Sequence, residues 1–298
     1  MKFSSGKDFL EWPQKAITII GMSGVGKTTL ANMVRRNDWF TYNVDYRIGT
    51  RYMGEHIVDN FKREAMKVPL LANLLRSDSI YISSNITFDN LAPLSTYLGK
   101  PGNPEKGGIS FKEYCRRQAQ HRKAEIAALT DIPHFIDRAH SIYGYDNFFC
   151  DTGGSLCEVI DLDAPVSSGA PDASGAPGDP VLKTLIDHSL IVYIKGSDSH
   201  TKTLVERFSK APKPMYYLPE FLEQKWAEYK ALNNISVDDD VDPDDFIVWG
   251  FEQLLHDRMP RYEQIASEHG YTIDMEDIPG LETDKDFVSL LARTIDNS

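Results

Sequence analysis

The stretch AITIIGMSGVGKTTLANMVRR, residues 16–36, decides the fold of this chain. Its first five residues form a short β-branched apolar run that ends at a glycine, which is typical of a fully buried strand, and residues 27–36 follow as a helix. Helical stretches then alternate with short apolar runs, so we expect an α/β fold in which helices cover both faces of a mostly parallel sheet, a three-layer α/β/α architecture. The further runs that predict strands are residues 41–44, 79–83, 147–150, 190–194 and 271–273.

The loop between the first strand and helix, residues 21–29, fits the pattern G-x-x-x-x-G-K-[ST] at every fixed position. Its glycines let backbone N–H groups point at phosphate oxygens, and the helix N-terminus adds the positive end of its dipole. We expect Lys27 to reach the β- and γ-phosphates of ATP and the Thr28 hydroxyl to ligate Mg²⁺, as in a P-loop NTPase fold. The other loop residues expected to bind the nucleotide are Gly21, Ser23, Gly24, Val25, Gly26 and Thr29.

Composition excludes several classes of protein. The chain has 298 residues, and its 41% hydrophobic and 26% charged residues exclude wholesale disorder. A net charge of −12 argues against general nucleic-acid binding, which needs a basic surface. No run approaches the roughly 18 apolar residues of a membrane helix, and residues 1–15 lack a signal-peptide core, so we expect no membrane partner. Cys115, Cys150 and Cys157 show no metal-ligand spacing, and we expect a reduced, cytoplasmic protein.

The pattern of strands and helices predicts a discontinuous core. Residues 1–51 and 146–298 carry the strand signals and form the expected P-loop core. Residues 52–145, between the second and third core strands, form a mostly helical insertion, within which residues 93–108 read as a mobile surface loop. Residues 164–180 are almost entirely Ala, Ser, Gly, Pro and Asp, which predicts a flexible loop.

Other motifs narrow the class of P-loop protein. The N-K-x-D base-recognition motif of GTPases is absent, and no apolar strand ends in the adjacent acids of AAA-type ATPases or helicases. Four later landmarks follow the phosphate loop in order, namely Asp45, Asp151-Thr152-Gly153-Gly154, Lys213-Pro214 and Arg258-Met259-Pro260. Together with the phosphate loop they resemble the shikimate kinase and gluconate kinase branch of the small, adenylate-kinase-like P-loop kinases. The resemblance implies that residues 1–51 and 146–298 form the kinase core and that residues 52–145 form the acceptor-binding subdomain.

The resemblance assigns roles to the first two of these landmarks. It implies that Asp45 contacts Mg²⁺ and orients the acceptor hydroxyl, although Asn43 replaces the first acid of the family's D-x-D pair. It implies that Gly153 and Gly154 let the acceptor approach the backbone closely. Asp151 ends the third strand, where it can order a Mg²⁺-bound water, and a tight turn with an Asp cap is the alternative.

The resemblance also assigns roles to three basic residues. It implies that Lys213, in place of the usual arginine, neutralises charge on the transferring phosphoryl group, without the bidentate fork of an arginine. Arg207 is similar to the arginine that flanks the adenine, and Arg258 to the arginine that grips the acceptor carboxylate. A solvated surface position for Arg207 and a structural role for Arg258 are the alternatives.

Two charged groups within and beside the predicted insertion have two interpretations each, and a third group lies later in the chain. Arg47 and Arg51 lie four residues apart and would share a helical face that binds an anion, or they bridge to neighbouring acids. Arg116-Arg117 and residues 121–123 form a basic cluster, either a solvated helix or a contact for a phosphorylated partner or nucleotide. The acidic run at residues 238–245 is expected to be a solvated loop that caps the next helix.

These observations predict a Mg²⁺- and ATP-dependent kinase that phosphorylates a hydroxyl of a small polar or anionic metabolite. Its expected catalytic residues are Lys27, Asp45, Asp151 and Lys213. A nucleoside or nucleotide kinase is one alternative, and a regulatory P-loop ATPase whose insertion binds a protein partner is the other. The acceptor, the choice between ATP and GTP and the oligomeric state stay open.

Overall fold

The computed structural model describes residues 1–164 and 178–298 of the chain. The chain divides into two compact units, and each is built from segments that are far apart in the sequence. The core unit comprises Met1–Val44, Ile126–Ala211 and Gly250–Ser298, and the helical unit comprises Asp45–Glu125 and Pro212–Trp249.

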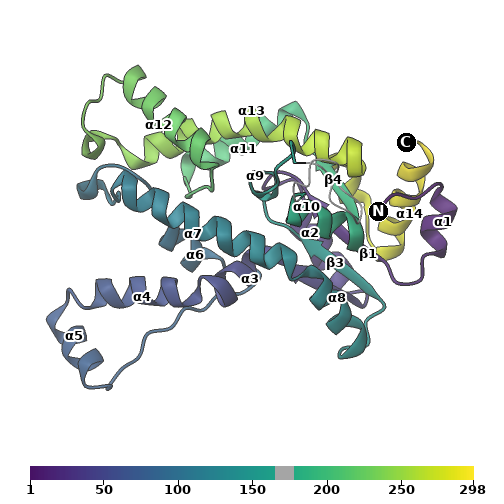
Figure 1. Cartoon of the computed structure of the whole chain (residues 1–298), viewed down its shortest axis with the longest axis horizontal. Helices are drawn as coiled ribbons and strands as arrows, with labels where there is room; N and C mark the ends of the chain where they lie inside the picture. The colour runs from purple at the N-terminus through teal and green to yellow at the C-terminus, as the bar shows by residue number, and fades with distance from the viewer. Residues whose placement is uncertain (165–177) are drawn as a thin grey trace. The chain divides into compact units, whose positions relative to one another are not determined.

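A five-stranded sheet forms the centre of the core unit (Figure 1). Its strand order is β2-β3-β1-β4-β5, and every neighbouring pair is parallel. All of β1 is buried, which explains its unbroken apolar run, because a parallel sheet under helices has no face open to water. The predicted α/β class is therefore confirmed. The strands are β1 (Ala16–Ile20), β2 (Trp39–Asn43), β3 (Asn147–Asp151), β4 (Leu190–Lys195) and β5 (Gly270–Asp274).

Helices pack on both faces of this sheet. Successive residues of a strand point to opposite faces, and in β3 the Phe148 ring lies against Tyr42, which contacts Phe135 of α8. The next residue, Phe149, contacts Phe287 of α14 with 6.2 Å between ring centroids. This layering is compatible with the expected α/β/α architecture. The helices that lie wholly in the core unit are α1 (Gly6–Glu11), α2 (Lys27–Arg35), α8 (Ile132–Ser141), α9 (Leu156–Val159), α10 (Pro180–His188), α11 (Asp198–Lys210), η4 (Met275–Gly280) and α14 (Asp284–Asp296).

The first and last helices of the core unit pack against each other (Figure 1). The backbone N–H of Gly6 donates to the Asp296 carboxylate at 2.7 Å. A Cβ atom on Gly6 would lie 2.4 Å from the carbonyl oxygen of Ala292, so only glycine allows this close approach.

The chain between β2 and β3 forms helices and two isolated bridges but no strand, in agreement with the predicted helical insertion. Two long helices, α7 (Phe111–Thr130) and α13 (Pro243–His269), contain the boundary between the units. The remaining helices outside the core unit are α3 (Val44–Arg47), η1 (Ile48–Tyr52), α4 (Gly54–Ala65), α5 (Pro69–Arg76), α6 (Ala92–Leu98), η2 (Pro104–Lys106), α12 (Pro219–Leu232) and η3 (Asp238–Asp240).

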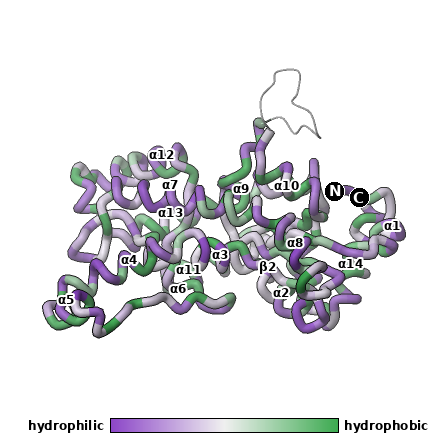
Figure 2. The backbone as a smooth tube through the Cα atoms, turned by 60° about the horizontal axis from the view of Figure 1, so that its bottom comes forward, coloured by the Kyte–Doolittle hydropathy of each residue, from purple (hydrophilic) through white to green (hydrophobic). Residues whose placement is uncertain are grey.

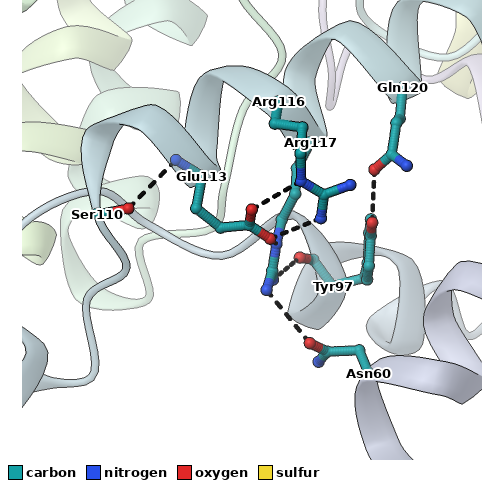
Figure 3. Close-up of polar contacts among 7 residues, drawn as sticks. All are labelled: Asn60, Tyr97, Ser110, Glu113, Arg116, Arg117 and Gln120. Carbon is teal, nitrogen blue, oxygen red and sulfur yellow. Dashed lines mark hydrogen bonds and ion pairs between the residues drawn. The ribbon is translucent and has the colours of Figure 1, made fainter. Parts of the chain in front are cut away.

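A buried arginine joins three helices of the helical unit (Figure 3). Arg117 of α7 is 8% exposed, and its guanidinium donates to the Glu113 carboxylate at 2.8 Å and to Asn60 of α4 at 3.2 Å. It also donates to the backbone carbonyl of Tyr97 in α6. Arg116 makes two hydrogen bonds of 2.7 Å to the same Glu113 carboxylate. Arg117 is thus neither solvated nor open to a partner, which corrects both interpretations of the basic cluster at this residue.

Two elements of the insertion differ from the predictions. The strand predicted at residues 79–83 does not form, because no strand lies beside this segment and Tyr81 is 87% exposed. The preceding helix α5 contains both hydrophobic and hydrophilic residues (Figure 2). One of its hydrophobic residues, Leu70, is 68% exposed. The predicted mobile loop at residues 93–108 instead contains most of α6 and the short helix η2.

Helix α13 is continuous over Pro243–His269, although Pro260 lies inside it. A proline removes one backbone hydrogen bond from a helix. The apolar face on both sides nevertheless stays buried, with Leu254 and Ile265 fully covered, and this tertiary packing sustains the helix across the proline.

The division into units also differs from the predicted domains. Residues 126–145 pack with the core, while residues 212–249 belong to the helical unit rather than to the core. Long-range packing of this kind leaves no mark in local composition. The predicted flexible loop at residues 164–180 falls mostly on residues 165–177, which lie outside the described residues. Within the described part of the chain, no helix is long and apolar enough to span a membrane.

Candidate functional site

The predicted phosphate loop connects β1 to α2 at the carboxyl edge of the sheet. Gly21, Gly24 and Gly26 adopt φ angles of +140°, +86° and +103°, a region of backbone space that only glycine occupies readily. Helix α2 begins at Lys27, and its N-cap residue, Gly26, has no side chain with which to bond the first N–H groups of the helix. A glycine turn that leads into an uncapped helix N-terminus is suited to bind an anion.

The side chains of the loop divide into buried and accessible ones. Lys27 is 6% exposed, and its ammonium group donates to the carbonyl oxygens of Gly21 and Met22, at 2.8 Å each. Ser23, Thr28 and Thr29 are exposed, whereas Val25 is buried. The loop thus holds a buried cation beside accessible hydroxyl groups.

Asp151 meets the loop from the neighbouring strand. It pairs in register with Ile19 of β1, and its Oδ2 accepts a hydrogen bond from the Thr28 hydroxyl at 3.3 Å. Asp151 is 4% exposed. A hydroxyl and a carboxylate side by side provide the hard oxygen ligands that Mg²⁺ takes when nucleotide phosphates supply the rest. The described residues contain no group of three or more His, Cys, Asp or Glu side chains that could hold a metal ion.

The predicted glycine segment after β3 lies against the phosphate loop. The Gly153 N–H donates to Asp151 Oδ1 at 3.2 Å, and Gly153 has a φ of +74°. A Cβ atom on Gly154 would lie 2.5 Å from the Ser23 hydroxyl oxygen and 3.3 Å from the Ser23 backbone nitrogen, so the two segments are in close contact here. The structure therefore brings Gly153, Gly154 and Asp151 together with the phosphate loop.

Arg258, the predicted carboxylate-binding residue, lies in the interior of the core unit and is 1% exposed. Its Nε donates to Glu158 of α9 at 2.7 Å, and its Nη1 donates to the carbonyl oxygen of Gly154 at 2.7 Å. Burial by itself lowers the pKa of Arg258, but Glu158 and other neighbours raise that pKa above its usual value, so the guanidinium stays charged. These contacts favour the structural interpretation of Arg258.

Sequence reasoning did not single out Glu158, although its side chain is fully buried. The available signal was an isolated acid inside the apolar run LCEVI at residues 156–160. A carboxylate at such a position needs a buried cation as its partner. Nothing in the local sequence identifies that cation as Arg258, 100 residues away.

Helix α11 carries the predicted adenine-flanking residue. Arg207 is exposed. Burial is the main cause that lowers the pKa of His200, and the nearby positive charge of Arg207 lowers this pKa further. His200 lines a small crevice together with Val25 of the phosphate loop and with Tyr193 and Gly196 at the end of β4. The structure thus places Arg207 on the helix that flanks this crevice.

The other predicted site residues belong to the helical unit. Asp45 lies in the first turn of α3, and Arg47 ends that helix with its guanidinium 5.5 Å from the centre of the Tyr52 ring. Arg51 is exposed on the π-helical turn η1. The anion-binding role of Arg47 and Arg51 remains a prediction.

Lys213 lines a cavity of about 610 Å³ in the helical unit. Two further lysines line this cavity: Lys100 pairs with Asp244, and Lys106 pairs with Asp242 at 2.7 Å. Within the described residues Lys213 forms no ion pair.

The acidic run at residues 238–245 caps the next helix, as expected. Asp242 Oδ1 accepts hydrogen bonds from the backbone N–H groups of Asp244 and Asp245 in the first turn of α13.

Two buried thiols lie directly beside the functional groups of the core unit. Cys150 precedes Asp151, and Cys157 precedes Glu158. Burial raises the pKa of Cys150 well above its usual value and that of Cys157 to about 12. Both thiols are therefore protonated and unreactive in the folded core unit.

A scan against protein-family models matches no family, and a search of the curated proteins finds no significant match.

Proposed function

We propose that this chain is a Mg²⁺- and ATP-dependent phosphotransferase that acts on a hydroxyl of a small polar or anionic metabolite. The observation that carries the proposal is the convergence of Lys27, Thr28 and Asp151 at one edge of the sheet. A buried ammonium, a hydroxyl and a carboxylate around a glycine turn match the needs of a magnesium nucleotide.

The strand order supports the same edge as the nucleotide site. The connection after β1 leads to β2 on one side of the sheet, whereas the connection after β4 leads to β5 on the other side. Ligands of open α/β sheets bind outside the carboxyl ends of the strands where such connections diverge. The crevice between Val25 and Gly196 lies at this point.

Each residue has a definite task in the proposed reaction. Lys27 binds the β- and γ-phosphates, while Thr28 and Asp151 hold and orient Mg²⁺ directly or through its water. When bound, Mg²⁺ neutralises charge on the phosphates during transfer. Gly153 and Gly154 place backbone groups beside the loop, and Arg207 flanks the base.

The acceptor side of the proposal rests on the family resemblance. Asp45 orients the acceptor hydroxyl and accepts its proton, Arg47 and Arg51 bind an anionic group, and Lys213 neutralises charge on the phosphoryl group. Arg258 is not retained as an acceptor ligand, because its guanidinium is 1% exposed and already bonded to Glu158 and Gly154.

Phosphate transfer from ATP to a panel of sugars, polyols, nucleosides and hydroxy acids tests the proposal. Lys27→Ala and Asp45→Asn should both abolish most of the transfer, and Lys285→Ala, at an exposed position on α14, is the matched control. If both variants kept full transfer, the proposal would be wrong. Transfer to nucleosides or their monophosphates alone would identify a nucleoside or nucleotide kinase. Slow hydrolysis without any acceptor, stimulated by a protein, would identify a regulatory ATPase.

A further inference from the structure

The buried ion pair between Arg258 and Glu158 is connected to the nucleotide site through very few bonds. Arg258 Nη1 holds the Gly154 carbonyl, and the adjacent residue Gly153 holds Asp151 Oδ1 through its N–H. The other carboxylate oxygen of Asp151 accepts the hydrogen bond from Thr28. One continuous series of contacts therefore runs from the interior of α13 to the proposed magnesium ligands.

The two glycines are the flexible link in this series. Glycine has the widest backbone freedom of all residues, so two in succession would by themselves sample many conformations. Gly154 also packs against Ser23 of the phosphate loop, which leaves little room for other arrangements. Arg258 holds the Gly154 carbonyl and Asp151 holds the Gly153 N–H, two groups separated only by the rotatable bonds of these two glycines. Anchoring the Gly154 carbonyl therefore restricts the positions that the Gly153 N–H, and with it the Asp151 carboxylate, can take.

Burial alone does not make this pair a large source of stability. Both side chains are at most 1% exposed, and the desolvation of two such charges offsets most of their attraction. Pairs of this kind often stabilise no more than apolar residues of the same size. Their advantage here is directional, because one planar guanidinium bonds a carboxylate and a backbone carbonyl at the same time.

We propose that Arg258 and Glu158 are positioning residues, a brace that fixes Gly153 and Gly154 and thereby holds Asp151 opposite Thr28 in the magnesium site. The part of this inference that concerns Mg²⁺ rests on the proposed function. The brace itself is a statement about the backbone of the core unit and can be tested without nucleotide.

The first test measures Mg²⁺ affinity in the full-length chain. Arg258→Lys keeps the charge but loses the planar guanidinium that fixes the directions of the bonds to Glu158 and Gly154. The double variant Arg258→Met with Glu158→Leu removes both charges and keeps the volume, which avoids an uncompensated buried charge. Arg293→Lys, at an exposed position on α14, is the matched control.

Each variant is titrated with Mn²⁺, detected by electron paramagnetic resonance, in the presence of ATP, and the affinity for a fluorescent ATP analogue is measured without metal. We expect Mn²⁺ affinity to fall about 10-fold or more in both brace variants, which is the range for loss of an outer-shell partner. Metal-free nucleotide affinity should change less than about twofold.

Unchanged Mn²⁺ affinity in the folded double variant would overturn the inference. An equal loss of metal-dependent and metal-free binding would do so as well, because it would indicate a general structural role. If Arg258→Lys fails to fold, the Mn²⁺ affinity of the double variant alone tests the inference.

The second test separates the brace from the proposed function. Hydrogen exchange at the Gly153 and Gly154 amides, measured without nucleotide, should be about 10-fold faster in Arg258→Lys than in the control. If the unmodified protein binds no nucleotide but exchange accelerates in this way, the proposed function fails and the brace stands. Equal exchange in both variants would refute the brace whatever the protein binds.

Discussion

Two buried cations show how differently the two units hold a charge. In the core unit, the Lys27 ammonium donates to carbonyl oxygens only five and six residues away, so the loop's own backbone holds it. In the helical unit, Arg117 takes its partners from three helices, including Tyr97 and Asn60, which lie 20 and 57 residues earlier. The first cation depends on a short local turn, and the second depends on the assembly of its unit. We therefore expect loss of the first to affect chemistry and loss of the second to affect folding.

The largest expected effect is that of Lys27→Ala on phosphate transfer. Removal of charge neutralisation in a transition state costs on the order of 10²–10³-fold in rate, by analogy with the loss of an oxyanion donor. Single-turnover transfer from ATP measures this loss. The melting temperature should stay close to that of the unmodified protein, because the two carbonyl contacts of the ammonium lie within the loop itself. A large drop in melting temperature with little change in rate would reverse the comparison.

Arg117→Met should lower the stability of the protein and leave nucleotide binding unchanged, the reverse of what we expect for Lys27→Ala. It leaves the Tyr97 carbonyl without this donor, which costs about 1–3 kcal/mol of unfolding free energy, while the half-exposed Glu113 keeps Arg116 as its partner. Urea denaturation followed by circular dichroism gives this value. Metal-free binding of a fluorescent ATP analogue should stay within about twofold, and a selective loss of that binding would show that the contrast between the units is false.

Asp151→Asn tests the chemistry of the core unit at its second oxygen ligand. The amide keeps the shape of the side chain but loses its charge, so Mg²⁺ should bind about 10-fold more weakly. Isothermal titration with Mg²⁺ at saturating ATP measures the change, and nucleotide binding without metal serves as the reference. Equal Mg²⁺ affinity in both proteins would remove Asp151 from the metal site.

The smallest expected effect is a pH dependence in the helical unit. Hydrogen bonds from Arg116 and, secondarily, Arg117 lower the pKa of Glu113 from 4.5 to about 2. A lowered pKa means that the carboxylate contributes stability above its unfolded pKa and loses that contribution as the pH falls from about 4.5 to 2. Thermal unfolding across this range should show the loss in the unmodified protein and a smaller one in Glu113→Gln. Identical pH profiles would contradict this account of the arginine cluster.

The same contrast explains what could be predicted from the sequence. The strand β1, the phosphate loop and the start of α2 depend on contacts between near neighbours, and the pattern of residues 16–36 predicts their place in the chain. The position of Asp151 could be predicted from the sequence as well, because this residue ends a recognisable buried strand. The partnership of Arg258 with Glu158 was not, since it joins residues 100 positions apart that share no motif. The division into units was missed for the same reason, because the return of residues 212–249 to the helical unit depends on tertiary packing.

Chemical labelling of the two buried thiols can report when the core unit opens. Cys150 and Cys157 each sit one residue before a group in the series that links α13 to the phosphate loop, and neither can react while it stays covered. A thiol reagent will therefore label them only when that region opens. The rate of labelling then follows the opening equilibrium without any added probe, and Cys115, which is only half-buried, supplies an internal standard from the helical unit.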